Sequence, residues 1–329
     1  TIDKGRREKA HQEAKFGRIY VVEEEDSFLN PSTPYASWVL PSELFMNLLG
    51  PPAQTLNLER IRATLIRLEE TIIFSLIERA QFAHNPKLYI RGGIQELADN
   101  GYDGTWLQWF LQETEMMHAK VRRYESPDEH PFTPTEKLAK PILPPLTYPR
   151  LLHPNNVNVN QKILHFYTQR IVPAITRKTN AQLGPDQEDD DGNYGSVATS
   201  DVQGLQAFSR RIHYGMFVAE SKFRSEPAAF IPHIQSRDEG ALADLITKPA
   251  VEVALLARLG KKASFYGQEL DAAGNPLSAD EEHLKIDVEE VVSLYRDYII
   301  PLTKDVEVAY LLTRLDGLSN EDITKMMNN

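Results

Sequence analysis

Five ionisable or hydroxyl side chains stand at positions where the surrounding helical pattern is apolar. Arg62 lies in a stretch rich in isoleucine and leucine. Arg211 and Lys222 are eleven residues apart, which in an α-helix is three turns and about 20° of rotation, so both point the same way. Thr303 and Glu307 are four residues apart and share a helix face. This placement predicts either a polar binding site or a set of ion pairs.

The chemistry of such a site follows if these faces converge inside the protein. Two arginine forks suit two carboxylates, and a lysine beside a buried, protonated glutamate suits a neutral oxygen. Glu252, in the first turn after Pro249, adds a second carboxylate. The predicted ligand is a small dicarboxylate with an ether or hydroxyl group. On spacing alone, solvated or salt-bridged side chains are the commoner arrangement, and Glu69 is typical of a structural partner for an arginine.

The composition excludes several classes of function. The 329 residues are 41% hydrophobic and 25% charged, which suits a globular protein with a large core. A net charge of −11 makes nucleic acid and anionic membrane surfaces poor partners. The lack of cysteine excludes disulfides, cysteine-bound metals and a thiol nucleophile, and it fits a cytoplasmic location. No apolar run spans a membrane, and neither a secretory signal nor a metal-binding motif is present.

Helical periodicity predicts the elements that must position the candidate residues. The first strong helix spans 56–82, with Asn57 as its N-cap. Because its apolar residues cover most of its circumference, we expect it to be buried on several sides. Further helices are predicted at 105–125, 157–177, 195–225, 237–246 and 249–264.

The last long helix is predicted from residue 288 to about 316. Asp287 and Glu290 have the spacing of a capping box at its start. Pro301 lies inside it and predicts a kink. No alternating strand pattern, repeat or glycine-rich phosphate loop is present.

The predicted fold is all-α, a single-domain bundle of long helices. Residues 1–55 change from basic to acidic and are interpreted as a loosely attached N-terminal arm, which leaves 56–329 as the folded domain. The proline-rich segment 126–154 is too apolar for a disordered linker, so we expect it to wrap around the surface. The segment 184–193 is predicted to be a solvated acidic loop.

Five motifs follow one another from about residue 56 to 316: NLERIRATLIRLEETIIFSLIERAQF, VRRYESPDEHPF, NYGSVATSDVQGLQAFSRRIHYGMFVAESKF, ITKPAVEVALLARLGKKA and IIPLTKDVEVAYLLTRL. Together and in this order they resemble the eukaryotic, fungal-type, all-helical chorismate mutases. The resemblance implies conversion of chorismate to prephenate, a [3,3]-sigmatropic rearrangement toward phenylalanine and tyrosine. It also implies that the reaction needs no cofactor and no metal.

The resemblance implies a role for each candidate residue. Arg62 and Arg211 match the arginines that hold the two carboxylates of chorismate. Lys222 and Glu307 match the pair at the ether oxygen, where negative charge grows as the C–O bond breaks. Glu307 can donate a hydrogen bond there only if it is protonated, so activity is expected to fall as the pH rises. Thr303 matches a residue that supports a carboxylate.

Two further positions of this site differ in how well they match. Glu252 in PAVE matches the contact to the substrate hydroxyl. Lys248 stands where the family usually has asparagine, and it is carried as a substrate-binding candidate although lysine cannot accept a hydrogen bond.

The resemblance also implies a homodimer that tyrosine inhibits and tryptophan activates. The effector would lie between the start of a long helix in one subunit and a neighbouring helix of the other, where helix N–H groups suit a carboxylate. Asp287 replaces a threonine that is tied to switching in some members. The matching effector-binding residues are Arg122, Arg123, Asn193, Gly195, Ser196 and Thr199.

Two other readings of the sequence remain. A catalytically inactive helical dimer could sense tyrosine or tryptophan, although such a sensor would not need Lys222 and Glu307. A purely structural helical protein would require the charges on the apolar faces to be incidental.

Overall fold

The computed structural model describes residues 46–184, 189–277 and 284–328. The chain divides into two units, Thr1–Pro41 and Ser42–Asn329, and all described residues belong to the second. The predicted arm therefore lies outside the described residues except for 46–55. Of the described residues 65% are helical, and they form two isolated β-bridges but no strand, so the all-α prediction is confirmed. No described helix is long and apolar enough to cross a membrane.

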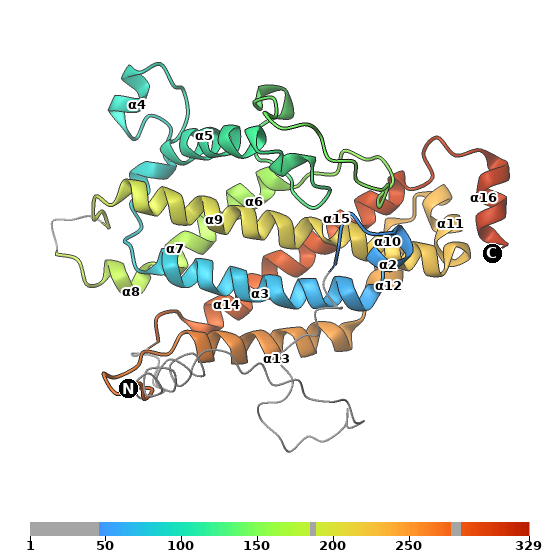
Figure 1. Ribbon diagram of the computed structural model, residues 1–329. Coiled ribbons are helices and arrows are strands. Elements are labelled where there is room, and N and C mark those ends of the chain that lie inside the picture. Colours follow the sequence, from blue (N-terminus) through green and yellow to red (C-terminus); the bar gives the residue numbers. More distant parts are fainter. Residues whose placement is uncertain (1–45, 185–188, 278–283, 329) are drawn as a thin grey trace, which may run out of the picture. The chain divides into compact units, whose positions relative to one another are not determined.

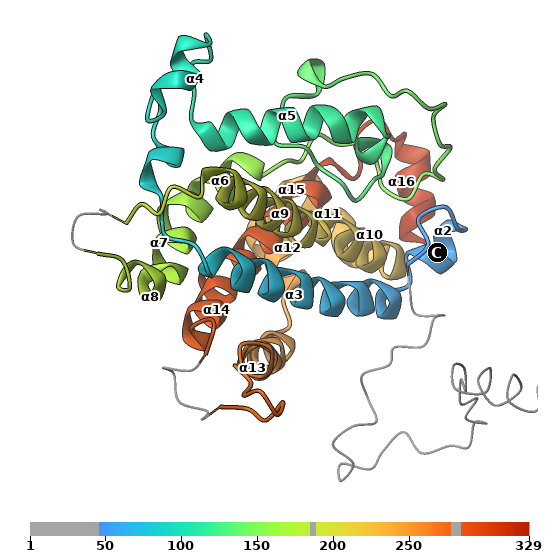
Figure 2. The same ribbon diagram turned by 60° about the vertical axis from the view of Figure 1, so that its left-hand side comes forward.

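The candidate residues are carried by a core of long helices. α3 packs along α9, α10 packs along α15, and α13 lies against α3 and α14 (Figures 1 and 2). Because α3 has neighbours on several sides, five of its isoleucines and leucines are buried, as its pattern predicts: Ile61, Leu68, Ile72, Ile73 and Leu76. The core helices are α3 (Leu58–Ala80), α9 (Tyr194–His213), α10 (Gly215–Ser225), α13 (Pro249–Tyr266), α14 (Val288–Leu294) and α15 (Ile300–Thr313).

Shorter helices surround this core. Three of them, α4, α11 and α16, lie where the sequence pattern predicts no helix. α11 has Pro232 in its interior, which hides its helical pattern from a reading of the sequence. The shorter helices are α2 (Pro52–Thr55), α4 (Gln95–Asp99), α5 (Trp106–Lys120), α6 (Asn160–Phe166), α7 (Val172–Ile175), α8 (Arg177–Asn180), α11 (Pro227–Ser236), α12 (Glu239–Ile246) and α16 (Asn320–Met327).

Side-chain caps fix where two core helices begin. The Asn57 side chain accepts hydrogen bonds from the backbone N–H groups of Glu59 (2.9 Å) and Arg60 (3.3 Å), so the predicted cap of α3 is confirmed. Asp287 caps α14 in the same way. The predicted capping box is only half formed among the described contacts, because the Glu290 carboxylate bonds to Arg177 instead.

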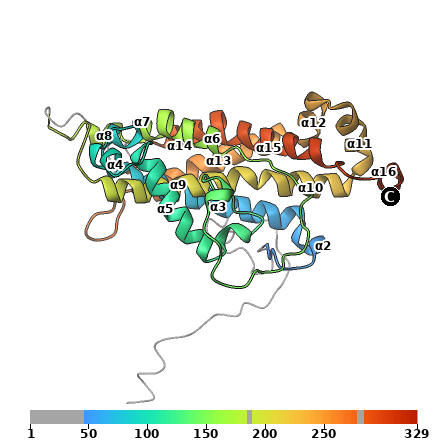
Figure 3. The same ribbon diagram turned by 90° about the horizontal axis from the view of Figure 1, so that it is seen from above.

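The helix predicted at 195–225 is divided in two. α9 ends at His213 and α10 begins at Gly215, with Tyr214 between them at φ −58° and ψ −17°. These are right-handed helical angles of a tightened turn, and Phe217 N donates to Tyr214 O at 3.1 Å, across three residues instead of four. The helix direction is kept across this break, and Figure 3 shows α9 and α10 almost in line.

Two other predicted helices, 157–177 and 288–316, are interrupted by a turn of π-helix. These turns span Tyr167–Ile171 and Tyr295–Ile299, and each is followed by a proline within the first two residues of the next helix. Proline lacks an N–H and clashes with the preceding turn. A widened π-turn accommodates it without ending the helix, and the disturbance at Pro301 takes this form.

The proline-rich segment 126–154 crosses the surface of the bundle as predicted. Most of its residues are exposed or half-buried. It is held by the buried Glu115 of α5, whose carboxylate accepts hydrogen bonds from Phe132 N (2.9 Å) and Thr133 N (2.7 Å). Leu151 anchors its far end in the core.

Candidate active site

The six predicted catalytic residues come from five core helices. Arg62 lies on α3, Arg211 on α9 and Lys222 on α10. Glu252 lies in the first turn of α13, and α15 carries both Thr303 and Glu307. α10 and α15 approach closely because Gly215 faces the latter: a Cβ there would lie 2.9 Å from Thr303 O and 3.0 Å from Glu307 Cγ.

Arg211 is a buried cation that makes no ion pair among the described residues. Its side chain is 4% exposed, and neither Nε nor Nη1 has a hydrogen-bond partner among the described residues. The guanidinium carbon lies 6.0 Å from the ring centre of Tyr295. Buried polar groups are normally paired, so these two donors mark a site for an anionic ligand.

Glu307 and Lys222 form the second charged element of the site. Burial raises the pKa of Glu307 to about 7, although Lys222 and Arg211 oppose that shift. Burial lowers the pKa of the half-buried Lys222; Glu307 opposes this, and Lys248 and Arg62 add to it. Below pH 7 the site therefore holds mainly a glutamic acid that can donate a hydrogen bond, beside several cations.

The Lys222 ammonium is held by the backbone. Nζ donates to the carbonyl oxygen of Ile246 at 2.5 Å, at the C-terminus of α12. Lys248 follows two residues later as the N-cap residue of α13, and its side chain is exposed. Arg62 is exposed as well. Both lie at the rim of the site, because both act electrostatically on Lys222.

Glu252 and Thr303 complete the cluster. The Glu252 carboxylate lies 2.8 Å from Nζ of Lys304, and both side chains are about one-third exposed. The Thr303 hydroxyl donates to Ile299 O at 2.6 Å. Lys304 also lowers the pKa of Glu307, so it belongs to the cluster. Sequence reasoning missed Lys304, although its place between Thr303 and Glu307 was a usable signal.

Glu69 makes the structural ion pairs that its sequence context predicts. It is 1% exposed, and its carboxylate lies 2.7 Å from Nη2 of Arg258 and 3.3 Å from Nζ of Lys262. These contacts join α3 to α13. Glu69 therefore holds together two of the helices that carry the site.

The predicted effector residues form two separate groups in one subunit. Arg123 donates to Gln206 Oε1 of α9 at 2.9 Å and pairs with Glu129 at 3.1 Å. Gln206 is eleven residues beyond Gly195, which is roughly 16 Å along the helix. Arg122 donates to Pro144 O at 2.5 Å. The group at the start of α9, which is exposed, consists of Asn193, Gly195, Ser196 and Thr199.

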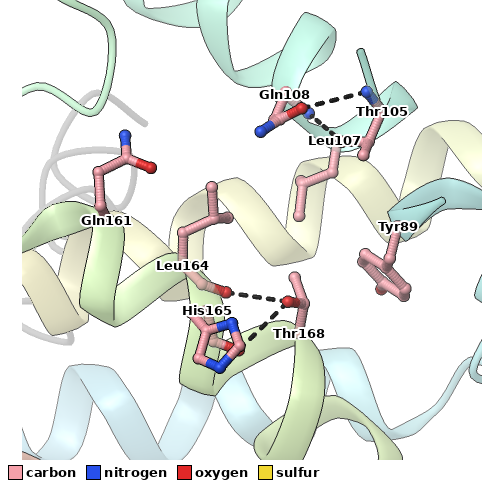
Figure 4. Close-up of a pocket in the computed structure, with 8 residues that line it drawn as sticks. All are labelled: Tyr89, Thr105, Leu107, Gln108, Gln161, Leu164, His165 and Thr168. Atoms are coloured by element: carbon pink, nitrogen blue, oxygen red, sulfur yellow. Dashed lines mark hydrogen bonds between the residues drawn. The ribbon is translucent and has the colours of Figure 1, made fainter. Parts of the chain in front are cut away.

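Two surface cavities lie away from the predicted catalytic residues. One of about 230 Å³ is lined by eight residues, among them Gln108, His165 and Thr168 (Figure 4). The other, of about 250 Å³, lies between η6 (Tyr167–Ile171) and α14. The described ranges contain no group of three His, Asp or Glu side chains that could hold a metal ion.

Comparisons with known proteins decide which family carries this cluster. A family model described as chorismate mutase type II matches residues 193–308. The chorismate mutase of Emericella nidulans is 46% identical over 269 residues, which cover 82% of this chain and 96% of that protein. The chain belongs to the chorismate mutase family. It is accordingly an isomerase.

Solved chorismate mutases share the fold. The Aro7p chorismate mutase of Candida albicans, in complex with L-Trp, superposes with a TM-score of 0.75 at 40% identity, over 85% of this chain and 99% of that one. AtCM1 with tyrosine bound in its allosteric site gives a TM-score of 0.66 at 43% identity, over 80% and 98%. AtCM1 was also solved with phenylalanine in the allosteric site.

Proposed function

We propose that the cluster around Arg211 is where chorismate is converted to prephenate. The observation that carries the proposal is the Arg211 guanidinium, buried with two free donors and facing a protonated glutamate and a lysine. Arg211 binds one carboxylate of chorismate inside the protein, and Arg62 binds the other at the rim. Held at both ends, the substrate keeps the two carbons that will bond close together.

Lys222 and Glu307 act on the ether oxygen. As the C–O bond breaks, negative charge develops on this oxygen, and a lysine already held in place stabilises it more than it stabilises the neutral ether. The protonated Glu307 donates a second hydrogen bond. Because both groups are in position before the reaction, little reorganisation is needed in the transition state.

The remaining residues orient the substrate. Glu252 accepts a hydrogen bond from the substrate hydroxyl, and Lys304 holds its carboxylate in place. Thr303 supports the carboxylate bound by Arg211. Lys248, at the rim, adds a cation that attracts the dianionic substrate to an acidic protein.

A binding experiment with Arg211→Met tests this assignment. We expect the variant to bind prephenate at least about a hundredfold more weakly than wild type, because two charge-assisted hydrogen bonds are lost. Without ligand it should unfold at the same or a higher temperature, because an unpaired buried charge is replaced by an apolar side chain. Isothermal titration and thermal unfolding measure the two effects.

The matched control is Arg210→Met on the same helix. Arg210 pairs with Asp128 at 2.5 Å and lies outside the cluster. This variant should keep prephenate binding and lose stability. The assignment is wrong if Arg211→Met binds prephenate normally, or if it unfolds at a lower temperature than Arg210→Met.

The effector site is proposed at the start of α9. Asn193, Gly195, Ser196 and Thr199 are exposed there, and the exposed N–H groups favour a carboxylate. The Candida albicans relative was solved in complex with L-Trp, and AtCM1 was solved with phenylalanine or tyrosine in its allosteric site. For this chain we propose inhibition by tyrosine and activation by tryptophan.

A homodimer would complete this site. Arg122 and Arg123 of the same subunit lie too far along α9 to reach the effector, so Arg122 and Arg123 of the partner subunit would supply the cationic side. Exposed apolar residues surround Arg122 and suit burial in an interface. They are Met117, Val121, Ile142, Leu143 and Leu146.

Rate measurements with effectors test the regulatory proposal. Tyrosine should lower the rate of prephenate formation and tryptophan should raise it, while light scattering should give twice the 37.4 kDa mass of the chain. A monomer that responds to both amino acids would refute the shared site. A dimer that responds to neither would refute the effector site.

We also place the enzyme in the cytoplasm. The lack of cysteine suits a reducing compartment, and the Emericella relative is named simply chorismate mutase, without an organelle. Several plant relatives are named chloroplastic. Imaging of the full-length chain fused to a fluorescent protein tests the location.

A further inference from the structure

The start of α9 is held by a buried asparagine that is distant in sequence. Asn85 is fully buried and adopts a left-handed conformation, with φ at 53°. Its Nδ2 donates to Ala83 O (3.0 Å) and to Asp191 Oδ1 (2.9 Å). Its Oδ1 accepts from Asp191 N (3.1 Å) and Gly192 N (3.3 Å). All four hydrogen-bonding positions of this amide are therefore used.

Asp191 reciprocates these contacts. Its Oδ2 accepts from Ala83 N at 2.8 Å, and its Oδ1 accepts from Asn193 N at 2.9 Å. Partial burial alone would raise the pKa of Asp191, but these backbone hydrogen bonds hold it below its usual value. The segment predicted as a solvated acidic loop is thus tied, at this residue, to the chain after α3. We call Asn85 and Asp191 together the clasp.

A second buried network fixes the other side of the clasp. Arg79 is fully buried, pairs with Asp201 of α9 at 2.8 Å, and donates to Ala83 O at 3.0 Å. Tyr89 and Tyr167 donate to the same Asp201 carboxylate. The clasp and this network share Ala83 O as an acceptor, so the clasp is connected through Arg79 to Asp201 of α9. On its other side the clasp contacts the start of α9.

The clasp is hydrogen-bonded to Asn193, the first residue of the proposed effector site. Asn193 is the N-cap residue of α9, but its side chain makes no capping hydrogen bond. An added Cβ at Gly195 would meet nothing within 4 Å. The clasp thus fixes the residue before the first turn of α9, while Gly195 and Ser196 of that turn remain exposed and its N–H groups can bind a ligand.

We propose that the clasp is a positioning element for effector binding, so that Asn85 and Asp191 set the strength of regulation without touching effector or substrate. This inference rests on the effector site proposed above. Asn193 and Arg211 are eighteen residues apart on one helix, or roughly 27 Å. Loosening the clasp should therefore weaken the effector response and spare the basal reaction.

Asn85→Gly is the sharpest test, because glycine accepts the left-handed backbone and removes only the side chain. We expect the tyrosine concentration for half-maximal inhibition to rise about tenfold or more, while kcat and KM without effector stay within about twofold of wild type. Amide hydrogen exchange of 191–196 should accelerate. The control is Asn155→Gly, a loop asparagine whose side chain makes two hydrogen bonds far from α9's start; it should leave regulation unchanged.

Asp191→Asn is the second variant if Asn85→Gly fails to fold. It keeps the shape of the side chain but leaves fewer acceptors for three donors, and the same rise is expected. The clasp is refuted if wild type responds to tyrosine and the folded variant responds equally, or if basal activity falls as much as regulation. If wild type binds none of tyrosine, tryptophan and phenylalanine, the effector site itself is wrong and the clasp has no regulatory role.

Discussion

The Lys222→Ala variant is expected to convert chorismate about a thousandfold more slowly than wild type. The lost ammonium is the group that meets the charge developing on the ether oxygen, and removal of one such preorganised donor typically costs two to three orders of magnitude or more in rate. The fold should survive, because Lys222 is half-buried and, among the described residues, its ammonium donates a hydrogen bond only to Ile246 O. We expect a stability change of about 1 kcal/mol.

Lys261→Ala is the matched control for this variant. Lys261 is an exposed lysine of α13, so its loss should leave the rate unchanged. Rates measured at saturating chorismate separate a slower reaction from weaker binding. If Lys222→Ala keeps a tenth of the wild-type rate, or if it unfolds, Lys222 does not act on the transition state as described.

Glu307→Gln is expected to change how the rate depends on pH. Burial raises the pKa of Glu307 to about 7, so wild type should lose activity as the pH rises through 7 and the donor is lost. Above that value the rate should fall about tenfold per pH unit. Glutamine donates a hydrogen bond at every pH, so the variant should keep its rate in alkaline solution. Lys222, Arg211, Lys304 and Glu252 all act on this carboxyl and set where the fall occurs.

The raised pKa of Glu307 also makes the stability of the fold depend on pH. A salt-bridged acid destabilises the fold as the pH falls, whereas Glu307 should destabilise it as the pH rises. Because the folded carboxyl binds its proton more tightly than the unfolded one, wild type should lose stability as the pH rises from about 4.5 to about 7. Glu307→Gln should remove this loss of stability, whereas Glu321→Gln, at an exposed glutamate, should not.

The rate measurement can also contradict the account. A wild-type rate of chorismate conversion that stays constant from pH 6 to 8 would contradict a protonated Glu307.

Local rules in the sequence predict much of the fold. The Asn57 cap and the apolar pattern after it place α3 to within two residues at each end. The eleven-residue spacing of Arg211 and Lys222 survives the break at Tyr214, because that residue keeps right-handed helical angles. Both side chains therefore interact electrostatically with Glu307, as expected for two residues on one helix face.

Features that depend on contacts distant in sequence could not be predicted. The Glu252–Lys304 pair joins two helices, and the sequence of neither helix shows that these two side chains meet. In the sequence Asn85 is an ordinary turn residue, and nothing near it indicates its hydrogen bond to Asp191, 106 residues away. The π-turns before Pro301 and in the helix at 157–177 reflect packing of the whole bundle as well as the local proline.

The initial rate of chorismate loss with purified full-length protein below pH 7, without effectors, tests the central claim most directly. The buried, unpaired Arg211 and the protonated Glu307 predict rapid conversion to prephenate, with no added metal or cofactor. A folded protein that binds tyrosine yet leaves chorismate unchanged would contradict this account and would favour the helical sensor.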